Sequence, residues 1–381
     1  MTSEQVKNRI HSIDIMRGVV ILLMLLDHVR ERFFSQMPVL DPMDVDVTSP
    51  GLFWSRFAAH FCAPTFIFLT GLSAWLYSHP SSGKVRSARS FLVKRGLFLI
   101  ALEVTVICFL WIWFIPTIFL QVIWAIGLCM LALALLINLP QRLLLALGLL
   151  IVFGHNLLTP ITFSPDEWGY TLWTILHDRG FISEGGLVNV KISYPVLPWI
   201  GVILLGYCAG PLYAHNRDSE DRKQWLIGLG LACLALFAIL RGLNIYGETL
   251  PWQQFSTAVQ TAMSIFNVTK YPPSLSFLLI TLALMFFGLW FFERPLNRFS
   301  NALRVYGSVP MFFYIFHLYV LLILYTICSA IFGANHGAYF AVNDITWIWL
   351  ITVVLAVTLY WPTKAFSHYK RKANKPWLKY L

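Results

Sequence analysis

Charged side chains are scarce in this sequence. Aspartate, glutamate, lysine and arginine together make up 12% of its 381 residues, whereas soluble domains carry about 25%. Hydrophobic residues reach 58%, and the mean hydropathy is +0.68. This composition excludes an ordinary soluble enzyme, and the long uncharged runs indicate a polytopic membrane protein.

The sequence also lacks the spacings that mark metal sites and disulfide frameworks. Its six cysteines all fall in or beside apolar segments, and none forms a CxxC pair. There is no internal repeat of the kind found in many secondary transporters, and no low-complexity linker. A signal peptide is not expected, because Asp14 and Arg17 interrupt the first apolar run and no small-residue cleavage site follows. We therefore expect residues 1–381 to form a single domain with a basic cytoplasmic tail over 364–381.

Long apolar runs recur along the whole chain. A helix needs about 20 mostly apolar residues to cross the hydrocarbon core of a bilayer, and about ten runs meet this requirement. The sequence therefore predicts an all-α transmembrane helix bundle. Only Pro116 separates the third run from the fourth, and a re-entrant pair of helices would leave the same pattern. The predicted spans are 13–34, 52–77, 91–115, 117–138, 143–159, 195–213, 225–243, 273–292, 308–331 and 346–363.

Basic residues are unevenly divided between the connecting segments. With the N-terminus inside, the cytoplasmic segments carry 20 lysines and arginines and the outer segments carry 7. This split follows the positive-inside rule, so we expect an even number of spans with both termini cytoplasmic. The net charge of +10 then reflects topology and contact with membrane lipid, and no nucleic-acid partner is expected. The outer loops near 35–51, 160–194 and 244–272 are long enough to hold a polar ligand.

The first predicted helix carries four polar side chains in an otherwise apolar run: Asp14, Arg17, Asp27 and His28. At about 100° per residue, Arg17 and His28 lie within about 20° of each other, and Asp14 lies within about 40° of His28. A rise of about 1.5 Å per residue separates Arg17 from His28 by about 16 Å along the helix axis. The polar stripe therefore runs from the cytoplasmic end of the helix to its outer end.

Two interpretations of this stripe are open. In the first, Asp14 and Arg17 form an i,i+3 pair at the inner interface, while Asp27 and His28 snorkel at the outer interface. In the second, the stripe lines a path through the bundle. His28 would then accept and return a proton, and Asp27 or an outer-loop carboxylate would orient its ring. The second interpretation makes His28 and Asp27 catalytic candidates and places Asp14 and Arg17 in substrate binding.

Polar residues in the second and third spans are further candidates. His60 lies about nine residues into the second span, where it faces His28 or bonds to a neighbouring backbone carbonyl. Arg56, one turn earlier, pairs with an outer acid or binds substrate. Glu103 lies in the middle of the third span, where a carboxylate needs a buried partner or a catalytic role.

The later spans hold two more candidates for substrate binding. His317 lies within the ninth span, where it contacts a bound substrate or His28, unless it is a helix-packing histidine. Lys270 stands beside Pro272 and Pro273 before the eighth span. Prolines remove backbone donors, so this segment either lines a polar pocket or is an ordinary helix start.

Five blocks of the sequence carry a resemblance to a known family. An Arg-Gly start of the first helix followed by a histidine resembles membrane-integral acyltransferases in general. The five blocks together resemble the bacterial branch of the heparan-α-glucosaminide N-acetyltransferase catalytic-domain family. They occur in order from about residue 9 to residue 320, and they are RIHSIDIMRG with DHVR, APTFIFLTG, YPVLPWIGVILLGYCAG, KYPPSLSF and YGSVPMFFYIFHLYV.

The resemblance implies a membrane-bound acyltransferase with no resident cofactor or metal. Such an enzyme moves an acyl group, typically acetyl, from cytoplasmic acyl-CoA to an acceptor at the outer face. The acceptor would be a sugar or a cell-envelope glycan, and the protein would lie in the bacterial inner membrane. Whether it forms a homo-oligomer is left open. His28 would be the catalytic position, as general base or as covalent carrier of the acyl group. Arg17, or the basic cluster from Lys84 to Arg95, would bind the phosphates of the donor.

Two other classes of protein compete with this interpretation. A transporter or flippase without acyl chemistry would also use an intramembrane track of Asp14, Arg17 and His28 for proton relay. A family member without activity would serve as a membrane scaffold. Acyl transfer by the purified protein would separate the three classes.

Overall fold

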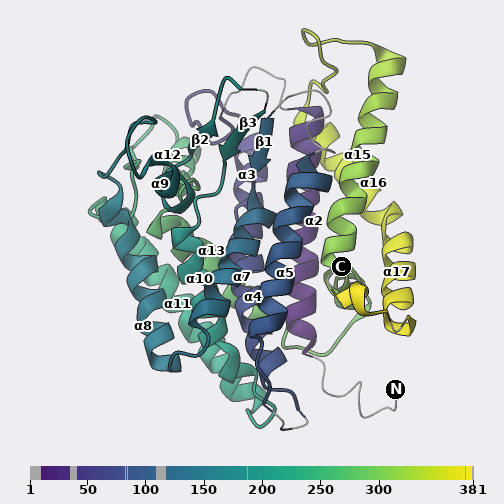
Figure 1. The fold of residues 1–381 in the computed structure, drawn as a ribbon. Helices are drawn as coiled ribbons and strands as arrows, with labels where there is room; N and C mark the ends of the chain where they lie inside the picture. Colours follow the sequence, from purple (N-terminus) through teal and green to yellow (C-terminus); the bar gives the residue numbers. More distant parts are fainter. Residues whose placement is uncertain are drawn as a thin grey trace. The chain divides into compact units, whose positions relative to one another are not determined.

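Helices dominate the structure (Figure 1), which confirms the predicted helical fold class. The computed structural model describes residues 10–34, 41–81, 83, 85–108, 117–186, 188–373 and 375–379. Pro116, Lys84 and the first nine residues lie outside these ranges, so the predictions that rest on them stay predictions. The chain forms two compact units. We call them the α2 unit, with residues 11–62, 252–267 and 291–381, and the sheet unit, with residues 63–251 and 268–290.

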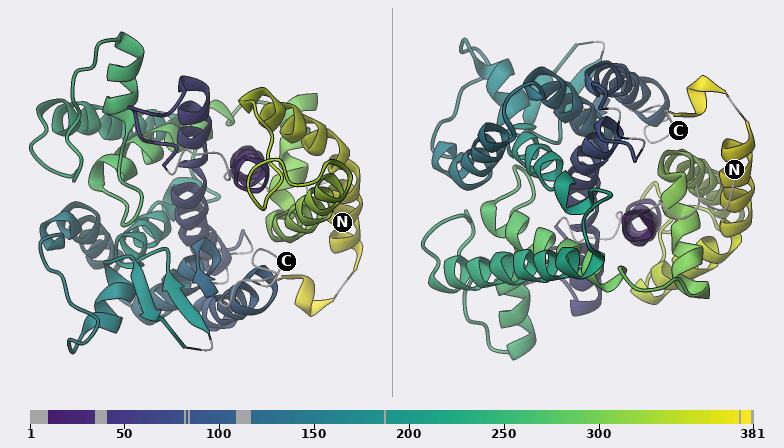
Figure 2. Two further views of the ribbon diagram at one scale, coloured as in Figure 1. Left: turned by 90° about the horizontal axis from the view of Figure 1, so that it is seen from above. Right: turned by 90° about the horizontal axis from the view of Figure 1, so that it is seen from below.

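Helix α2 is surrounded by other helices of its own unit. It contacts α14, α15, α16 and α3. In the two end-on views of Figure 2, α2 is the purple ring beside the green and yellow helices of the C-terminal part. The helices of the unit are α2 (His11–Phe33), α3 (Pro50–Ala59), α12 (Ala258–Phe266), α14 (Arg298–Ser308), α15 (Pro310–Phe332), α16 (Ile345–Thr358) and α17 (Tyr360–Lys372).

Two glycines allow α2 and α14 to touch backbone to backbone. A Cβ atom built on Gly18 would lie 2.0 Å from the carbonyl oxygen of Leu303, and one built on Gly307 would lie 1.7 Å from the carbonyl oxygen of Asp14. Small residues at such crossings are typical of helices that pack within membranes. The close crossing explains why the first sequence block has a glycine at position 18, directly after Arg17.

Gly18→Ala is expected to destabilise the folded protein by about 1–3 kcal/mol, because the new methyl group meets a backbone that cannot rotate away. Thermal unfolding in detergent measures the effect. Gly228→Ala in helix α11 (Ser219–Leu243) is the matched control, since a Cβ atom there meets nothing within 4 Å. Equal melting temperatures for Gly18→Ala and Gly228→Ala would contradict the close crossing of α2 and α14.

The sheet unit combines a helical part with a small mixed sheet. Helices α4 and α10 cross at Gly71 and Gly206, where an added Cβ atom would lie 2.1 Å from a carbonyl oxygen of the opposite helix in each case. Both glycines belong to sequence blocks of the resemblance. The helices of the unit are α4 (Cys62–Ser78), α5 (Arg89–Leu102), α7 (Val122–Leu136), α8 (Gln141–Gly154), α9 (Tyr170–Leu176), α10 (Leu197–Cys208), α11 (Ser219–Leu243) and α13 (Leu275–Phe291).

The three-stranded sheet was not predicted. Strand β3 (Asn189–Ile192) pairs in parallel with β1 (Thr117–Leu120) and antiparallel with β2 (Gly180–Ser183). The predicted span 117–138 is therefore wrong at its start, where four residues form a strand and the helix begins at Val122. The β-branched and aromatic residues of this run suit a strand as well as an apolar helix.

The predicted span 52–77 is interrupted. Helix α3 ends at Ala59 and α4 begins at Cys62. Pro64 accounts for the break, since a proline within a helix clashes with the carbonyl four residues earlier, here that of His60, and lacks the amide proton to bond it. With the two residues between them, the two helices make up the 29 residues of the segment Pro50–Ser78.

Within the residues that the structure describes, five helical segments are long and apolar enough to cross a membrane, and three shorter apolar helices accompany them. Helix α2 has 23 residues but is not among the five, because it carries its charged stripe. These helices agree with an integral membrane protein, while the count of ten spans and the position of the termini stay predictions. The five segments are Pro50–Ser78, Gln141–Leu158, Ser219–Leu243, Pro310–Phe332 and Ile345–Lys372.

Glu103 has a structural partner within the sheet unit. It begins a π-helical turn, Glu103–Ile107, and is 1% exposed. Its carboxylate accepts the backbone amide of Trp124 at 3.0 Å, in the first turn of α7. A carboxylate at a helix N-terminus satisfies free amide groups and stabilises the helix dipole. The structure thus supports the pairing interpretation of Glu103.

Candidate active site

The polar stripe of α2 is largely buried within the α2 unit. Asp14 is 5% exposed, and Asp27 is 9% exposed at the other end of the helix. The environment is apolar along most of the helix between them, where the side chains of Val20, Ile21 and Leu25 are almost fully buried. Burying a charged side chain in apolar surroundings costs free energy, so charged residues within a bundle are usually paired, functional, or both.

Asp14 and Arg17 form an ion pair. Nη1 of Arg17 donates to Oδ1 of Asp14 over 3.3 Å, and the Arg17 side chain keeps 22% of its exposure. One turn earlier, the hydroxyl of Ser12 donates to Glu293 over 2.6 Å. The i,i+3 pair predicted from the sequence is therefore present, and a role of Arg17 in donor binding stays a proposal.

His28 and His317 meet inside the α2 unit. Nδ1 of His28 lies 2.7 Å from Nε2 of His317, and the two rings are stacked with centroids 5.0 Å apart. Nδ1 of His317 lies 2.7 Å from the carbonyl oxygen of Phe313, and His317 is fully buried. The ring of Tyr314 stands edge-on to both histidines, at 5.8 Å from His28 and 5.7 Å from His317. Of the two contacts predicted for His317, the structure shows the one with His28.

These contacts determine which nitrogen of each neutral ring carries the proton. The carbonyl of Phe313 only accepts, so Nδ1 of His317 must donate to it, and Nε2 of His317 is then an acceptor. Nδ1 of His28 donates to that acceptor. The lone pair of the His28 ring is therefore on Nε2, the nitrogen opposite the contact with His317.

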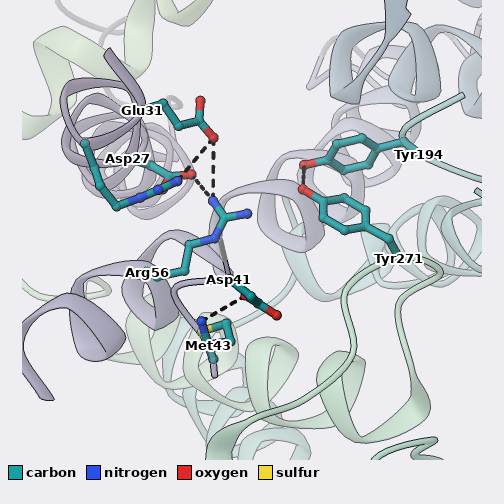
Figure 3. A network of polar contacts seen from close by, with 8 residues as sticks. Asp27, Glu31, Asp41, Met43, Arg56, Tyr194 and Tyr271 are labelled. Atoms are coloured by element: carbon teal, nitrogen blue, oxygen red, sulfur yellow. Dashed lines mark hydrogen bonds and ion pairs between the residues drawn. The ribbon is translucent and has the colours of Figure 1, made fainter. Parts of the chain in front are cut away.

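Asp27 is held by two arginines. One carboxylate oxygen accepts from Nε of Arg30 at 3.0 Å, and the other accepts from Nη1 of Arg56 at 2.5 Å. Glu31 adds a second carboxylate, 3.3 Å from Arg30 and 3.8 Å from Arg56. Figure 3 shows the Arg56 guanidinium reaching the carboxylates of Asp27 and Glu31. We call these four residues the arginine–carboxylate cluster.

The arginine–carboxylate cluster joins the C-terminal end of α2 to α3. The turn before α3 is ordered by Asp41, whose carboxylate accepts the amide of Met43 at 2.9 Å (Figure 3). The ion pairs of Arg56 with Asp27 and Glu31 confirm the predicted pairing of Arg56 with an acid. The predicted catalytic role of Asp27 and a substrate contact of Arg56 stay proposals.

His60 and Lys270 lie in different units. His60 follows α3 in the α2 unit, is 2% exposed, and packs against the ring of Phe57 at 5.9 Å. Lys270 precedes α13 in the sheet unit, where its ammonium lies over the rings of Tyr194 and Tyr271. The structure thus brings His28, His317, Asp27 and Arg56 into the α2 unit and gives Lys270 a different environment.

Sequence reasoning missed three residues around His28. Arg30 was counted only among the basic residues of the outer segments, although it is three residues after Asp27 and an i,i+3 pair follows from helical spacing. Glu31 was not considered. Tyr314 is three residues before His317 on α15, so the same spacing places it on the same face. The contact between His28 and His317 had no local signal, because 289 positions separate the two residues.

Comparison with known proteins identifies the family. Residues 9–246 match the family described as heparan-alpha-glucosaminide N-acetyltransferase, catalytic. This range covers more than half of the chain and contains His28 and Arg56, whereas Lys270 and His317 lie beyond it. No curated protein matches the chain. The catalytic-domain match indicates an acetyltransferase-type enzyme, and the chain belongs to the heparan-alpha-glucosaminide N-acetyltransferase catalytic-domain family.

Proposed function

We propose that this protein moves an acyl group, preferably acetyl, from cytoplasmic acyl-CoA to an amine or hydroxyl of a sugar or cell-envelope glycan at the outer face of the bacterial inner membrane. His28 is the catalytic base. The observation that carries the proposal is the contact chain from the Phe313 carbonyl through His317 to His28, which leaves the lone pair of His28 on Nε2. Membership of the family supports the acetyl group and the sugar acceptor.

The transfer step balances with one base. The acceptor nitrogen or oxygen attacks the thioester carbonyl, its proton passes to Nε2 of His28, and the carbon–sulfur bond breaks. The CoA thiolate then takes up the proton, which returns His28 to its neutral form. A general base within hydrogen-bond reach accelerates such a step by about 10²- to 10⁴-fold.

Nε2 of His28 can also act as a nucleophile that holds the acyl group between two transfers. We favour the general-base role, because it needs only the lone pair on Nε2 that the contact with His317 already provides. Incubation with labelled acetyl-CoA alone, an acid quench and mass analysis of the His28 peptide separate the two roles. A stable acetyl adduct on His28 would replace the base by the covalent carrier.

The cytoplasmic end of α2 is proposed to receive the donor. Arg17 keeps partial exposure while paired with Asp14, so its planar guanidinium has further donors for a phosphate of CoA. About 16 Å separates Arg17 from His28 along the helix, a distance that the extended pantetheine arm would cover along the polar stripe.

Arg17→Lys is expected to raise KM for acetyl-CoA with a smaller fall in kcat, because the charge stays and the planar fork is lost. Steady-state kinetics at varied acetyl-CoA measures the split. Arg142→Lys at the start of α8 is the control for loss of an exposed guanidinium. A destabilised Arg17→Lys protein with normal donor affinity would leave Arg17 as the structural partner of Asp14, and exchange of these two residues would then restore stability.

The proposed function is tested by incubating purified protein with labelled acetyl-CoA and a panel of amino sugars and envelope glycans. Transfer of label to a sugar is the expected result. A transporter would release no labelled product but would move substrate across sealed vesicles, and a scaffold would do neither. Either outcome would overturn the assignment of acyl transfer.

A further inference from the structure

Four residues of the sheet unit surround a patch with two positive charges and two tyrosine rings. Arg179 precedes β2, Tyr194 lies between β3 and α10, and Lys270 and Tyr271 precede α13. We propose that Arg179, Lys270, Tyr194 and Tyr271 form a binding site for the anionic group of an acidic sugar, a carboxylate or a phosphate ester. Its use for acceptor recognition rests on the proposed function, whereas the binding site itself does not.

Lys270 supplies the strongest argument. It is 9% exposed, and its ammonium lies 5.3 Å from the ring centroid of Tyr271 and 5.9 Å from that of Tyr194. Within the described part of the chain, no carboxylate or other hydrogen-bond acceptor pairs with it. Ring faces attract a cation but replace a counter-ion only in part. A largely buried lysine in such surroundings is suited to an anion that is supplied from outside the protein.

Arg179 brings a second positive charge to the same ring. Its guanidinium lies over Tyr271 at 4.9 Å from the centroid. The neighbouring carboxylate of Asp178 accepts from Nδ1 of His177 at 3.0 Å, and the described residues include no acid paired with Arg179. Two cations against one ring repel each other, and an anion bound between them would offset that repulsion. Arginine and lysine together are also the usual protein partners of phosphate and carboxylate.

The tyrosines add groups that suit a sugar ring. Tyr194 and Tyr271 stand edge to face with centroids 5.0 Å apart, and their hydroxyls are 3.4 Å apart. Figure 3 shows the two hydroxyl groups pointing toward each other. Each side chain presents an apolar face and a polar tip, which matches the mixture of C–H and hydroxyl groups on a sugar. A sugar that bears an anion is therefore favoured over a free inorganic ion.

The segment with Lys270 and Tyr271 is fixed before any ligand binds. Oε1 of Glu248 accepts from the hydroxyl of Thr269 at 2.5 Å, and Oε2 accepts from the hydroxyl of Ser274 at 2.7 Å. The amide of Ser274 also donates to the carbonyl of Thr269 at 2.9 Å. These bonds hold both ends of the segment, so less conformational entropy is lost on binding. They also engage Glu248, the acid nearest to Lys270 in sequence.

Equilibrium binding to the purified, detergent-solubilised protein tests the site. The probes are glucuronic acid and glucosamine 6-phosphate, with neutral N-acetylglucosamine, inorganic phosphate and phosphatidylglycerol nanodiscs as comparisons. The acidic sugars are expected to bind at least roughly tenfold more tightly than the neutral sugar, and Lys270→Gln is expected to abolish most of this preference. Arg179→Gln, at an exposed position, is expected to weaken binding similarly without a change in folding.

Lys191→Gln is the matched control. Lys191 is a lysine of the same unit that lies over a single ring, that of Phe181, at 4.6 Å. Its substitution removes one charge and is expected to leave the affinity for acidic sugars unchanged. Equal losses in Lys191→Gln and Arg179→Gln would overturn the site, as would equal binding of acidic and neutral sugars.

Two further outcomes would overturn the sugar assignment. One is binding of inorganic phosphate as tight as that of the sugar phosphate, and the other is binding of phosphatidylglycerol nanodiscs without binding of either acidic sugar. His28→Ala is expected to bind acidic sugars normally. Binding that survives in a protein without acyl transfer would therefore separate failure of the proposed function from failure of this site.

Discussion

Replacement of His28 by alanine is expected to reduce kcat for acyl transfer by about 10² to 10⁴, the usual loss when a general base is removed. The protein should still insert into the membrane and bind acetyl-CoA, because His28 is only partly buried and the nearby residues Asp27 and Arg30 keep their own ion pair. Steady-state kinetics and donor binding on the purified variant measure both parts.

His368→Ala provides the matched control for His28→Ala. His368 lies exposed on α17, so its removal deletes an imidazole without touching the contact with His317. Normal turnover in a folded His28→Ala protein would contradict the assignment of His28 as the catalytic base. His28 would then be an interfacial residue, as in the first interpretation of the stripe.

His317→Phe is expected to lower kcat by about 10 to 10³ while KM for the donor changes little. Phenylalanine fills a similar volume but removes the acceptor that holds the proton on Nδ1 of His28, so the ring loses its fixed tautomer. In the serine-protease triad, loss of the group that fixes the histidine tautomer costs about 10⁴ in kcat. His317 does not need to touch substrate for this effect.

A conservative variant and a spectrum distinguish a tautomer effect from a packing defect. His317→Gln keeps one acceptor and one donor, so it is expected to recover part of the activity that His317→Phe loses. In protein with ¹⁵N-labelled histidine, the His28 signals should show the proton on Nδ1 in the unsubstituted protein and a mixture of tautomers in His317→Phe. If His317→Phe has low activity but an unchanged His28 spectrum, His317 acts only through packing and does not set the tautomer of His28.

Features encoded locally could be predicted from the sequence. The first predicted span, 13–34, coincides with the helix His11–Phe33, and the ninth, 308–331, coincides with the helix Pro310–Phe332. The pair of Asp14 and Arg17 also follows from helical spacing alone. Each of these features depends on residues within one helix, where periodicity is informative.

Features that depend on distant segments were beyond such reasoning. In sequence, β1 resembles the start of an apolar helix. It is a strand because it pairs with β3, where Thr117 lies opposite Asn189, 72 positions later in the chain. The partners of His28 on α15 and the ring of Tyr194 at Lys270 likewise come from separate parts of the chain. The break before Cys62 was different, because Pro64 was visible in the sequence and its effect on His60 follows from known proline geometry.

Transfer across a sealed membrane tests the central claim most directly. Proteoliposomes would enclose glucosamine or glucosamine 6-phosphate, and labelled acetyl-CoA would be added outside, where it reaches only the molecules whose cytoplasmic face is turned outward. We predict that labelled N-acetyl sugar accumulates inside vesicles with the unsubstituted protein and not inside vesicles with His28→Ala. Label that stays on CoA in both preparations, or product that forms equally with His28→Ala, would contradict acyl transfer by His28.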